Sequence, residues 1–297
     1  TGDVRVLRGA GWDSGTAYSR LAFRNVADST FTFYYFGFRL ARSYSEVVTV
    51  QGVDFVNIPA RTFEMGCTSG QSDCDGDETL HTVTLTQNYY VSKMEVTQGQ
   101  FEDVMGYNPS SFSSCGDDCP VEQVDWHESA AFANALSASA GFELCYACTG
   151  SGASSDCSVA INPYDCEGYR LLTEAEWEGA ARCGQDSLYA GSNTVGDVAW
   201  YYDNSSNSVQ AVGGKSVNAC GLFDMSGNVW EWTQDWYGTS SLVDASDPVG
   251  ELSGTERAIR GGGWAAPAAD ARVSERNFNI TTGPSVNLGF RVARSNP

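Results

Sequence analysis

Ten cysteines are the side chains best equipped for chemistry in this 297-residue chain. The CYAC run at 145–148 has a spacing that can hold zinc or a redox pair, but it lies in a stretch rich in glycine and serine without a nearby histidine. An even number of cysteines, against two histidines, indicates disulfides formed in an oxidising compartment. We therefore expect a secreted, cell-surface or periplasmic protein, with pairing inside local groups and the connectivity left open. The groups are Cys67 and Cys74; Cys115 and Cys119; Cys145, Cys148, Cys157 and Cys166; and Cys183 and Cys220.

Two other patterns invite a metal-binding interpretation. The acidic run DCDGDE at 73–78 lacks the glutamate at the twelfth position and the following helix of an EF-hand, so it predicts a solvated loop. His81 and His127 have no ligand partners at useful spacing, which favours structural imidazoles.

The charge balance restricts the partners. The formal net charge is −20 and the lysines are Lys93 and Lys215, so a phosphate backbone would be repelled and no nucleic-acid partner is expected. A hydrophobic content of 42% is enough for a core. The apolar runs fall short of the roughly 18 residues that a membrane span needs, so no span is expected.

The elements that position these residues are few helices and many short strands. Helices are expected over 97–106, 124–141 and 173–184, because each segment ends on a glycine and the first and third open with a capping box. The remainder reads as short aromatic-rich strands between long loops of Gly, Ser, Asn and Asp. The sequence therefore predicts a loop-rich α+β fold that disulfides stabilise.

The chain also contains an internal repeat. LRGAGW at 7–12 returns as IRGGGW at 259–264, and arginines, aromatics and glycines up to position 43 recur at an offset of 252 without a gap. We interpret residues 1–43 as a copy of the C-terminal segment, 44–52 as a linker and 53–297 as the domain proper.

From residue 53 onward, specific motifs follow one another in a fixed order. They are IPARTFEMG, YYVSKMEVTQGQF, PVEQVDW, GYRLLTEAEWEGAAR, GLFDMSGNVWEWTQDW, IRGGGW and LGFRVARS. This series resembles the formylglycine-generating enzyme (sulfatase-modifying factor) family over residues 53 to 295. The resemblance implies a C-type-lectin-like fold.

The active members of that family oxidise a cysteine in a sulfatase with copper held by two cysteines, two and seven residues after the aromatic of their RGGS[WY] motif. At those places this chain has Ala266 and Ala271, and the N-terminal copy has Ser14 and Ser19. Neither alanine nor serine can hold Cu(I). The chain is therefore expected to bind no copper and not to be an enzyme, and a divergent copper-dependent oxidase is the alternative.

The same resemblance implies a calcium site in GNVWEW at 227–232. Asn228, Val229 and Glu231 would supply oxygen ligands within one turn of chain. In the alternative interpretation, Trp230 and Trp232 are core aromatics and Glu231 pairs with an arginine. We expect calcium as a structural ion.

The two copies of the repeat share one set of residues, which we call the frame, and differ at the positions between those shared residues. This pattern resembles the variable proteins diversified by retroelements, although drift after duplication explains it equally well. In the fold, the frame arginines Arg272 and Arg276 should make fixed bidentate pairs, and the changed residues should face solvent. The recognition residues expected on these loops are Ala265, Ala266, Asp270, Phe278, Asn279, Thr281 and Asn287.

Residues 1–43 carry many aromatic side chains that would not stay in water. They should pack on their own domain or on neighbouring copies, and the chain could also be a window of a tandem array with a period of 252. We therefore expect a non-catalytic extracellular or surface protein that binds a protein or glycan ligand, or assembles with itself.

Overall fold

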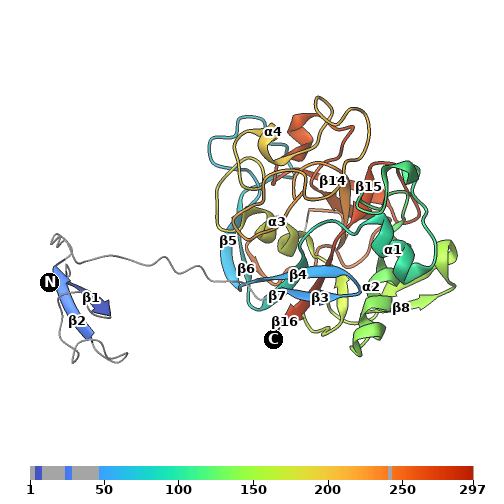
Figure 1. Ribbon diagram of the computed structural model, residues 1–297, viewed down its shortest axis with the longest axis horizontal. Helices are drawn as coiled ribbons and strands as arrows, with labels where there is room; N and C mark the ends of the chain where they lie inside the picture. Colours follow the sequence, from blue (N-terminus) through green and yellow to red (C-terminus); the bar gives the residue numbers. More distant parts are fainter. Residues whose placement is uncertain (1–3, 9–23, 29–46, 240–242, 297) are drawn as a thin grey trace. The chain divides into compact units, whose positions relative to one another are not determined.

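The computed structural model describes residues 4–8, 24–28, 47–239 and 243–296 (Figure 1). Two compact units divide the chain, Thr1–Tyr44 and Ser45–Pro297, and each is described by itself. In the first unit, β1 (Val4–Arg8) pairs with β2 (Arg24–Asp28) as an antiparallel ribbon. The expected recognition, calcium and copper positions from 228 onward all lie in the second unit. Ser14 and Ser19 lie outside the described residues.

The second unit is a mixed α+β domain, as the sequence predicted. Its strands are short and its four α-helices in the described range hold a minority of the residues. The strands are β3 (Val48–Val50), β4 (Val53–Ile58), β5 (Arg61–Met65), β6 (His81–Leu85), β7 (Asn88–Ser92), β8 (Tyr146–Thr149), β9 (Asp156–Val159), β10 (Tyr169–Leu171), β11 (Trp230–Trp236), β12 (Ala245–Ser246), β13 (Glu256–Arg260), β14 (Arg276–Ile280), β15 (Leu288–Phe290) and β16 (Val292–Asn296). The α-helices are α1 (Gln98–Met105), α2 (Trp126–Ala140), α3 (Glu174–Arg182) and α4 (Val195–Val198), and the 3-10 helices are η2 (Ser113–Cys115), η3 (Gly152–Ser154) and η4 (Ala268–Ala271).

Two sheets organise this domain. One has five strands in the order β10-β16-β7-β4-β3, and the other has four in the order β14-β13-β11-β15. β11 lies inside the second sheet, where it pairs antiparallel with β13 and parallel with β15. Among the described strands, β14 pairs with β13 alone, so it forms an edge of that sheet. Smaller sheets, β12-β6-β5 and β8-β9, complete the described strands of the domain.

The boundary of the domain lies earlier than predicted. Residues 48–50 fall inside the range interpreted as a linker, yet they form β3 and pair with β4. Val48 and Val50 alternate with an exposed threonine, and both pack against the hydrophobic core. The linker prediction overlooked this three-residue strand because it is too short to show a pattern.

The three predicted helices form, and the two predicted capping boxes, at Thr97 and Thr173, are present; α2 has a third one, at Asp125, that was not predicted. Thr97, Asp125 and Thr173 each accept a backbone N–H from the third helical residue, whose side chain bonds back to the cap. The helices at 97–106 and 124–141 end on left-handed glycines, Gly106 and Gly141. The third helix ends one residue before its expected glycine, because Cys183 takes the left-handed position.

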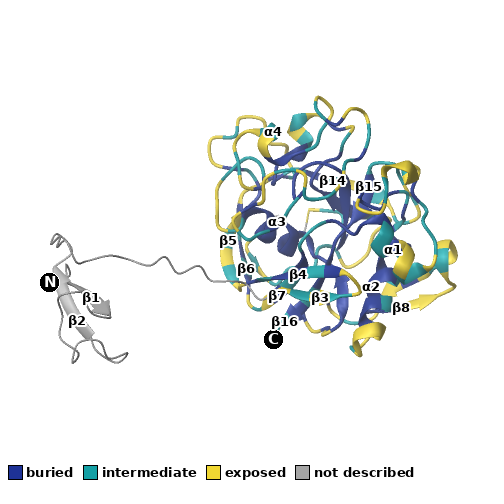
Figure 2. Ribbon diagram, viewed as in Figure 1, coloured by how far each residue is buried: buried dark blue, intermediate teal, exposed yellow. Residues whose placement is uncertain are grey.

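α3 is held in the interior by ion pairs. Every residue of α3 is buried, which Figure 2 shows as a dark blue helix. Glu174 pairs with Arg276, Glu176 with Arg170, and Glu178 with Arg182 and Arg260. Each carboxylate therefore meets a buried guanidinium, which offsets the large cost of removing charge from water.

Five disulfides link all ten cysteines. They join Cys67 to Cys74, Cys115 to Cys119, Cys145 to Cys166, Cys148 to Cys157, and Cys183 to Cys220. Each bond stays inside one of the local groups seen in the sequence. No helix among the described residues is long and apolar enough to cross a membrane.

Candidate recognition face

The GNVWEW segment begins with two residues in the left-handed region, Gly227 (φ 81°) and Asn228 (φ 66°). A Cβ on Gly227 would lie 2.3 Å from the carbonyl oxygen of Trp200, so only glycine fits there. The Asn228 amide Nδ2 donates to Glu95 Oε2 (2.6 Å), and its Oδ1 accepts the backbone N–H of Gln210 (3.0 Å). Both ends of the Asn228 side chain are therefore engaged.

Glu231 is engaged as well. Its carboxylate accepts bonds from Nε of Arg291 at 2.7 and 2.8 Å and from the indole N–H of Trp177 at 2.7 Å. Trp230 and Trp232 are buried at 5% and 1% exposure.

Calcium requires six to eight oxygens without a competing cation. Residues 228–231 do not fit that requirement as arranged, because Arg291 already neutralises Glu231 and the Asn228 amide oxygen already accepts a hydrogen bond. The arrangement corresponds to the alternative interpretation of this segment, with core tryptophans and a paired glutamate.

Two more buried carboxyl groups lie near Glu231. Burial raises the pKa of Glu95 well above its usual range, and the nearby Asp224 and Glu231 raise it further. Burial also raises the pKa of Asp224 to about 6, and its Oδ1 has no hydrogen-bond partner. Arg291 faces all three groups and offsets only part of their charge.

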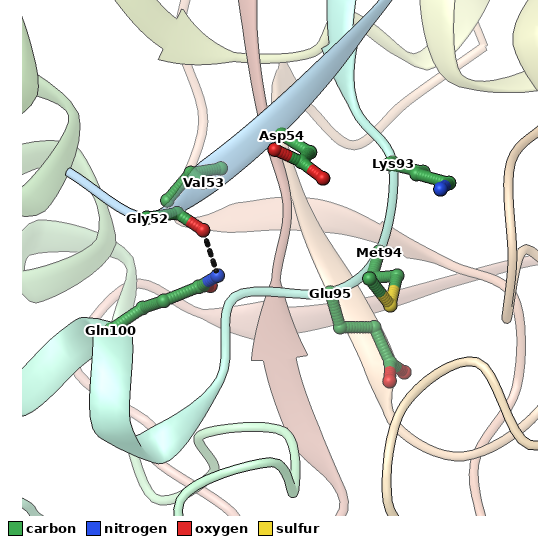
Figure 3. Close-up of a pocket in the computed structure, with 7 residues that line it drawn as sticks. All are labelled: Gly52, Val53, Asp54, Lys93, Met94, Glu95 and Gln100. Atoms are coloured by element: carbon green, nitrogen blue, oxygen red, sulfur yellow. Dashed lines mark hydrogen bonds between the residues drawn. The ribbon is translucent and has the colours of Figure 1, made fainter. Parts of the chain in front are cut away.

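A small pocket opens beside Glu95 (Figure 3). Its volume of about 30 Å³ has room for a water-sized guest and excludes an organic substrate. Gln100 of α1 closes one side by donating to the carbonyl oxygen of Gly52 (2.9 Å). The lining residues are Gly52, Val53, Asp54, Lys93, Met94, Glu95 and Gln100.

The half-buried Trp264 forms the centre of a surface built from three segments. Its ring meets Phe112 edge-on, with centroids 5.3 Å apart, and its indole N–H donates to the carbonyl oxygen of Val286 (3.0 Å). Gln123 joins the same segments, because its backbone N–H donates to Ser285 (2.9 Å) and its side chain to Ser111 (3.3 Å). We call Ser111, Phe112, Gln123, Trp264, Ala265 and Val286 the Trp264 face. Trp264 is partly buried, because it packs against the small core cluster of Cys119, Val209 and Val229.

The fully buried carboxyl group of Glu122 bonds to the backbone of this face. Glu122 Oε1 accepts the backbone N–H of Phe112 (2.7 Å), and Oε2 is buried without a hydrogen-bond partner. Burial raises the pKa of Glu122 from about 4.5 to about 7, while the bonds from the backbone of Phe112 and Ser111 lower it. Glu122 therefore fixes the backbone that presents Phe112 to Trp264.

The β14 edge is a second exposed feature. Phe278 and Ile280 are 44% and 50% exposed. Their backbone N–H groups donate to the side chains of the preceding residues, Asn277 Oδ1 (2.8 Å) and Asn279 Oδ1 (2.9 Å). These bonds occupy donors that an added strand would need, so the edge favours contact through side chains over strand addition.

The structure brings only some of the expected recognition residues to the surface. Ala265 and Phe278 are exposed, and Thr281 and Asp270 are half-exposed. Asn279 and Asn287 are half-exposed too, but their side chains bond to Gly283 and Ser285 of the same loop.

The prediction that Ala266 faces solvent as a recognition residue is wrong. It is buried at 6% exposure, because its backbone bonds to Gly263 and Tyr202 turn its side chain inward. It therefore cannot contact a ligand.

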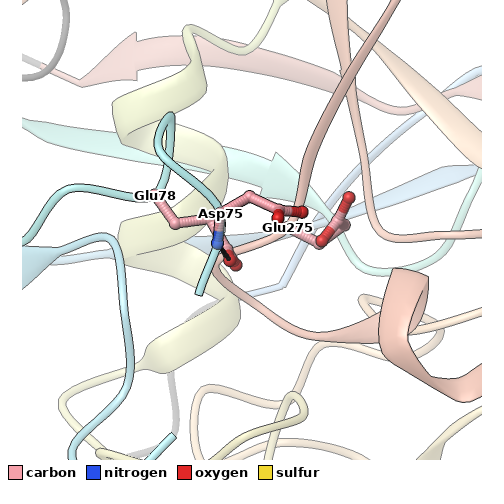
Figure 4. Close-up of side chains that lie close together, drawn as sticks. All are labelled: Asp75, Glu78 and Glu275. Atoms are coloured by element: carbon pink, nitrogen blue, oxygen red, sulfur yellow. Dashed lines mark hydrogen bonds between the residues drawn. The ribbon is translucent and has the colours of Figure 1, made fainter. Parts of the chain in front are cut away.

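The acidic loop at 73–78 contributes to a cluster of carboxylates, Asp75, Glu78 and Glu275 (Figure 4). Glu78 accepts the backbone N–H of Asp75 (2.7 Å) and the hydroxyl of Ser274 (2.7 Å). Arg272 lies against both glutamates, 3.4 Å from Glu78 and 2.6 Å from Glu275. The guanidinium thus occupies the place where a cation would be needed.

Both histidines contact the backbone. Nδ1 of His81 lies 2.7 Å from the carbonyl oxygen of Thr79, and Nδ1 of His127 lies 3.0 Å from the backbone N of Cys157. Neither belongs to a metal-ligand group among the described residues.

The model of the family described as "Sulfatase-modifying factor enzyme 1-like domain" matches residues 45–296. The chain belongs to this family. The chaperone protein LppX of Paenibacillus barcinonensis is 34% identical over 242 residues, which cover 72% of this chain and 82% of LppX. The formylglycine-generating enzyme of Streptomyces coelicolor is 34% identical over 146 residues, but they cover only 42% of this chain and 46% of that enzyme.

A solved structure of the same kind is Treponema denticola variable protein 1. It superposes with a TM-score of 0.74 at 32% identity, covering 84% of this chain and 99% of that protein. PvdO from Pseudomonas aeruginosa superposes with a TM-score of 0.68 at 24% identity, covering 86% and 100%, and supports the fold alone. The predicted fold, the C-type-lectin-like one of the sulfatase-modifying factor family, is confirmed.

Within this sulfatase-modifying factor domain, the two positions assigned to copper-binding cysteines are buried alanines. Ala266 and Ala271 are 6% and 1% exposed. All ten cysteines are in disulfides, so the chain has no thiol to offer from elsewhere. A disulfide sulfur does not replace the thiolate ligands that select Cu(I).

Sequence reasoning missed part of the Trp264 face of this sulfatase-modifying factor domain. Phe112, Ser111 and Gln123 come from a segment about 140 to 150 residues before Trp264, so no spacing pattern links them. In the sequence, PVEQVDW at 120–126 stands out only as one of the family motifs. Gln123 has a positive φ of 62°, a strained conformation that is more frequent at functional sites than elsewhere, but it is visible only in the structure.

Proposed function

We propose that this chain is a non-catalytic protein of an oxidising compartment, secreted, cell-surface or periplasmic, that binds a ligand on the Trp264 face and the neighbouring β14 edge. The observation that carries the proposal is the state of its sulfurs. Five disulfides use every cysteine, and alanines stand at the two copper positions. A scaffold without thiolates supports recognition and does not support the copper chemistry of the formylglycine-generating enzymes.

A turnover assay separates this proposal from the alternative of a divergent oxidase. We expect purified chain, supplied with Cu(I), oxygen and a cysteine-containing sulfatase peptide, to produce no formylglycine and to retain no stoichiometric copper. The readout is the mass of the peptide, and an active formylglycine-generating enzyme serves as the positive control. Aldehyde formation by the pure chain would establish the alternative.

A protein ligand agrees better than a glycan with the exposed surface. Phe112 and Trp264 are partly buried and present the remainder of their aromatic area, and Phe278 is 44% exposed while its ring lies 4.7 Å from that of Tyr237 at an angle of 37°. Large rigid aromatics are enriched where proteins bind proteins. The relative LppX is named a chaperone, a role exerted on another protein, which also supports a protein ligand.

Substitution on the β14 edge tests the surface directly. We expect Phe278→Asp to weaken the tightest hit from a protein and glycan array about tenfold or more, since a central aromatic of an interface contributes most of the binding energy. The measurement is the dissociation constant by biolayer interferometry, with thermal unfolding to show that the fold is kept.

Leu144→Asp is the matched control, because Leu144 is 46% exposed and follows the end of α2. Leu144 lies between α2 and β8, outside the sheet that contains β14, so this variant removes an exposed apolar side chain from another part of the domain. Equal weakening by Phe278→Asp and Leu144→Asp would rule out the β14 edge as the binding surface.

Calcium binding by Asn228, Val229 and Glu231 stays a prediction, and in this structure it would require a rearrangement of side chains. An ion would have to displace Arg291 from Glu231. If it does, about 1 mM calcium raises the melting temperature relative to EDTA, because a ligand that binds only the folded state stabilises it. Glu231→Gln should abolish that rise. An unchanged melting temperature in the parent chain would leave the Arg291 pair as the role of Glu231.

Contact with neighbouring copies through residues 1–43 is the assembly part of this proposal. Such contact would add a structural role to ligand binding. Such contact would have to bury surface of the β1–β2 ribbon against a neighbouring copy.

A further inference from the structure

One face of the β13–β14 pair is covered by α3 at one end only. Arg260 and Arg276 lie opposite each other at that end, and glutamates of α3 pair with both. Successive side chains of a strand alternate between its faces, so Phe278 and Ile280 share the face of Arg276. Exposure rises along this face, from 6% at Arg276 to 44% at Phe278 and 50% at Ile280. The far end of the face is therefore open to solvent.

Two more apolar side chains adjoin the open end. The ring of Tyr237 lies 4.7 Å from that of Phe278. Glu251 forms a β-bridge with Trp236, the residue before Tyr237, and the next residue, Leu252, is 95% exposed. Exposed apolar side chains that gather in one place and are rimmed by polar groups mark interaction sites. We call Tyr237, Leu252, Phe278 and Ile280 the Phe278 patch.

Carboxylates lie beside the Phe278 patch. Asp77 Oδ2 accepts the hydroxyl of Tyr237 (2.5 Å), and the half-exposed Glu256 lies opposite Ile280 on the same face. The ion pairs among the described residues include neither Asp77 nor Glu256. The patch thus combines apolar area with an excess of negative charge.

This combination favours one kind of occupant. A second copy of the chain carries the same formal charge of −20, so electrostatic repulsion opposes its approach. Strand addition is disfavoured as well, because Asn277 and Asn279 occupy backbone donors of β14. A segment with apolar side chains for the patch and cations for Asp77 and Glu256 matches both the surface and its charge.

We propose that the Phe278 patch docks a protein segment in which apolar side chains adjoin lysine or arginine. Phe278 and Ile280 contact the apolar side chains, and Asp77 and Glu256 receive the cations. The proposal rests on the proposed function, because the β14 edge belongs to the proposed binding surface, and it adds the chemistry of the partner.

Synthetic peptides of equal length test this chemistry. The first places leucine and lysine at the spacing of an amphipathic helix, the second has glutamate for every lysine, and the third has serine for every leucine. Binding to the 297-residue chain is measured by biolayer interferometry at about 0.15 M salt, which screens distant charges. We expect the leucine/lysine peptide to bind about tenfold or more tightly than the other two. Equal affinity for the leucine/lysine peptide and either of the others would overturn the proposal.

Matched variants locate the binding of the leucine/lysine peptide. Phe278→Ala should weaken it about tenfold, whereas Leu144→Ala, which also truncates an exposed apolar side chain, should leave it unchanged. Glu256→Lys should slow association about threefold or more, whereas Glu102→Lys makes the same charge change on the exposed side of α1 and should not. Equal effects within either pair would overturn the proposal, because binding would then follow overall charge or hydrophobicity. Thermal unfolding verifies that each variant keeps its fold.

The outcomes separate this proposal from the proposed function. An array ligand that is weakened by Phe278→Asp and unaffected by Glu256→Lys would keep the recognition surface and overturn the basic partner. A dimer of the parent chain that grows with concentration in light scattering and is lost in Phe278→Ala would overturn it in favour of a second copy. Formylglycine production by the pure chain would overturn the proposed function and leave the peptide result as it stands.

Discussion

Glu176→Ala should lower the free energy of unfolding by about 3–5 kcal/mol, because it leaves a buried guanidinium without its partner. Arg170 and Glu176 meet through two parallel bonds, at 2.6 and 2.8 Å, and both side chains are about 1% exposed. Glu176 also accepts the backbone N–H of Thr173 (3.0 Å) and so completes the capping box of α3. The measurement is guanidinium unfolding followed by tryptophan fluorescence.

Two controls identify the cause. Glu102→Ala removes an exposed carboxylate from α1 and should change the unfolding free energy by less than about 0.5 kcal/mol. The double variant Arg170→Met with Glu176→Leu replaces the pair by apolar groups of similar size, and should cost less than Glu176→Ala. A single variant as stable as the parent chain would show that the pair contributes little.

Removing the Cys183–Cys220 disulfide should cost about 4 kcal/mol on the loop-entropy scale. This bond spans 37 residues and joins the end of α3 to the loop before GNVWEW. Without it the unfolded chain regains the freedom of that long loop, so the unfolded state is favoured. The measurement is the unfolding midpoint of the Cys183→Ala, Cys220→Ala variant at fixed pH.

The Cys115–Cys119 disulfide provides the matched comparison, because it spans only four residues. Its removal by the same double alanine change should cost about 2 kcal/mol on the same scale. If the two variants were equally destabilised, chain entropy would not be the main contribution, and local packing around the bonds would have to explain the loss.

Much of the fold was predictable because its determinants are local. A capping box and a terminal glycine place α1, and a terminal glycine ends α2, because these signals lie within a few residues of the helix they limit. The local grouping of the cysteines likewise predicts bonds inside each group. In the group of four, however, only the structure pairs Cys145 with Cys166 and Cys148 with Cys157, because spacing alone permits other pairings.

The proposed recognition surface was only partly predictable. Divergence between the repeat copies pointed to Ala265 and Phe278, which are exposed. It also pointed to Ala266, which a turn buries, and it gave no indication of Phe112, which reaches Trp264 from a distant segment. Sequence patterns report the period of one element and do not report which loops meet.

The sequence by itself determined the family, three of the four α-helices in the described range, the oxidised state of the cysteines and the frame of the repeat, all of which depend on near neighbours or on an ordered series of motifs. Only the tertiary structure decided how the charged groups are used. Glu231 meets Arg291 60 residues later, and Arg276 meets Glu174 102 residues earlier. A carboxylate in a sequence is equally compatible with an ion or with an arginine, and the choice is made by which of them the folded chain brings within bonding distance.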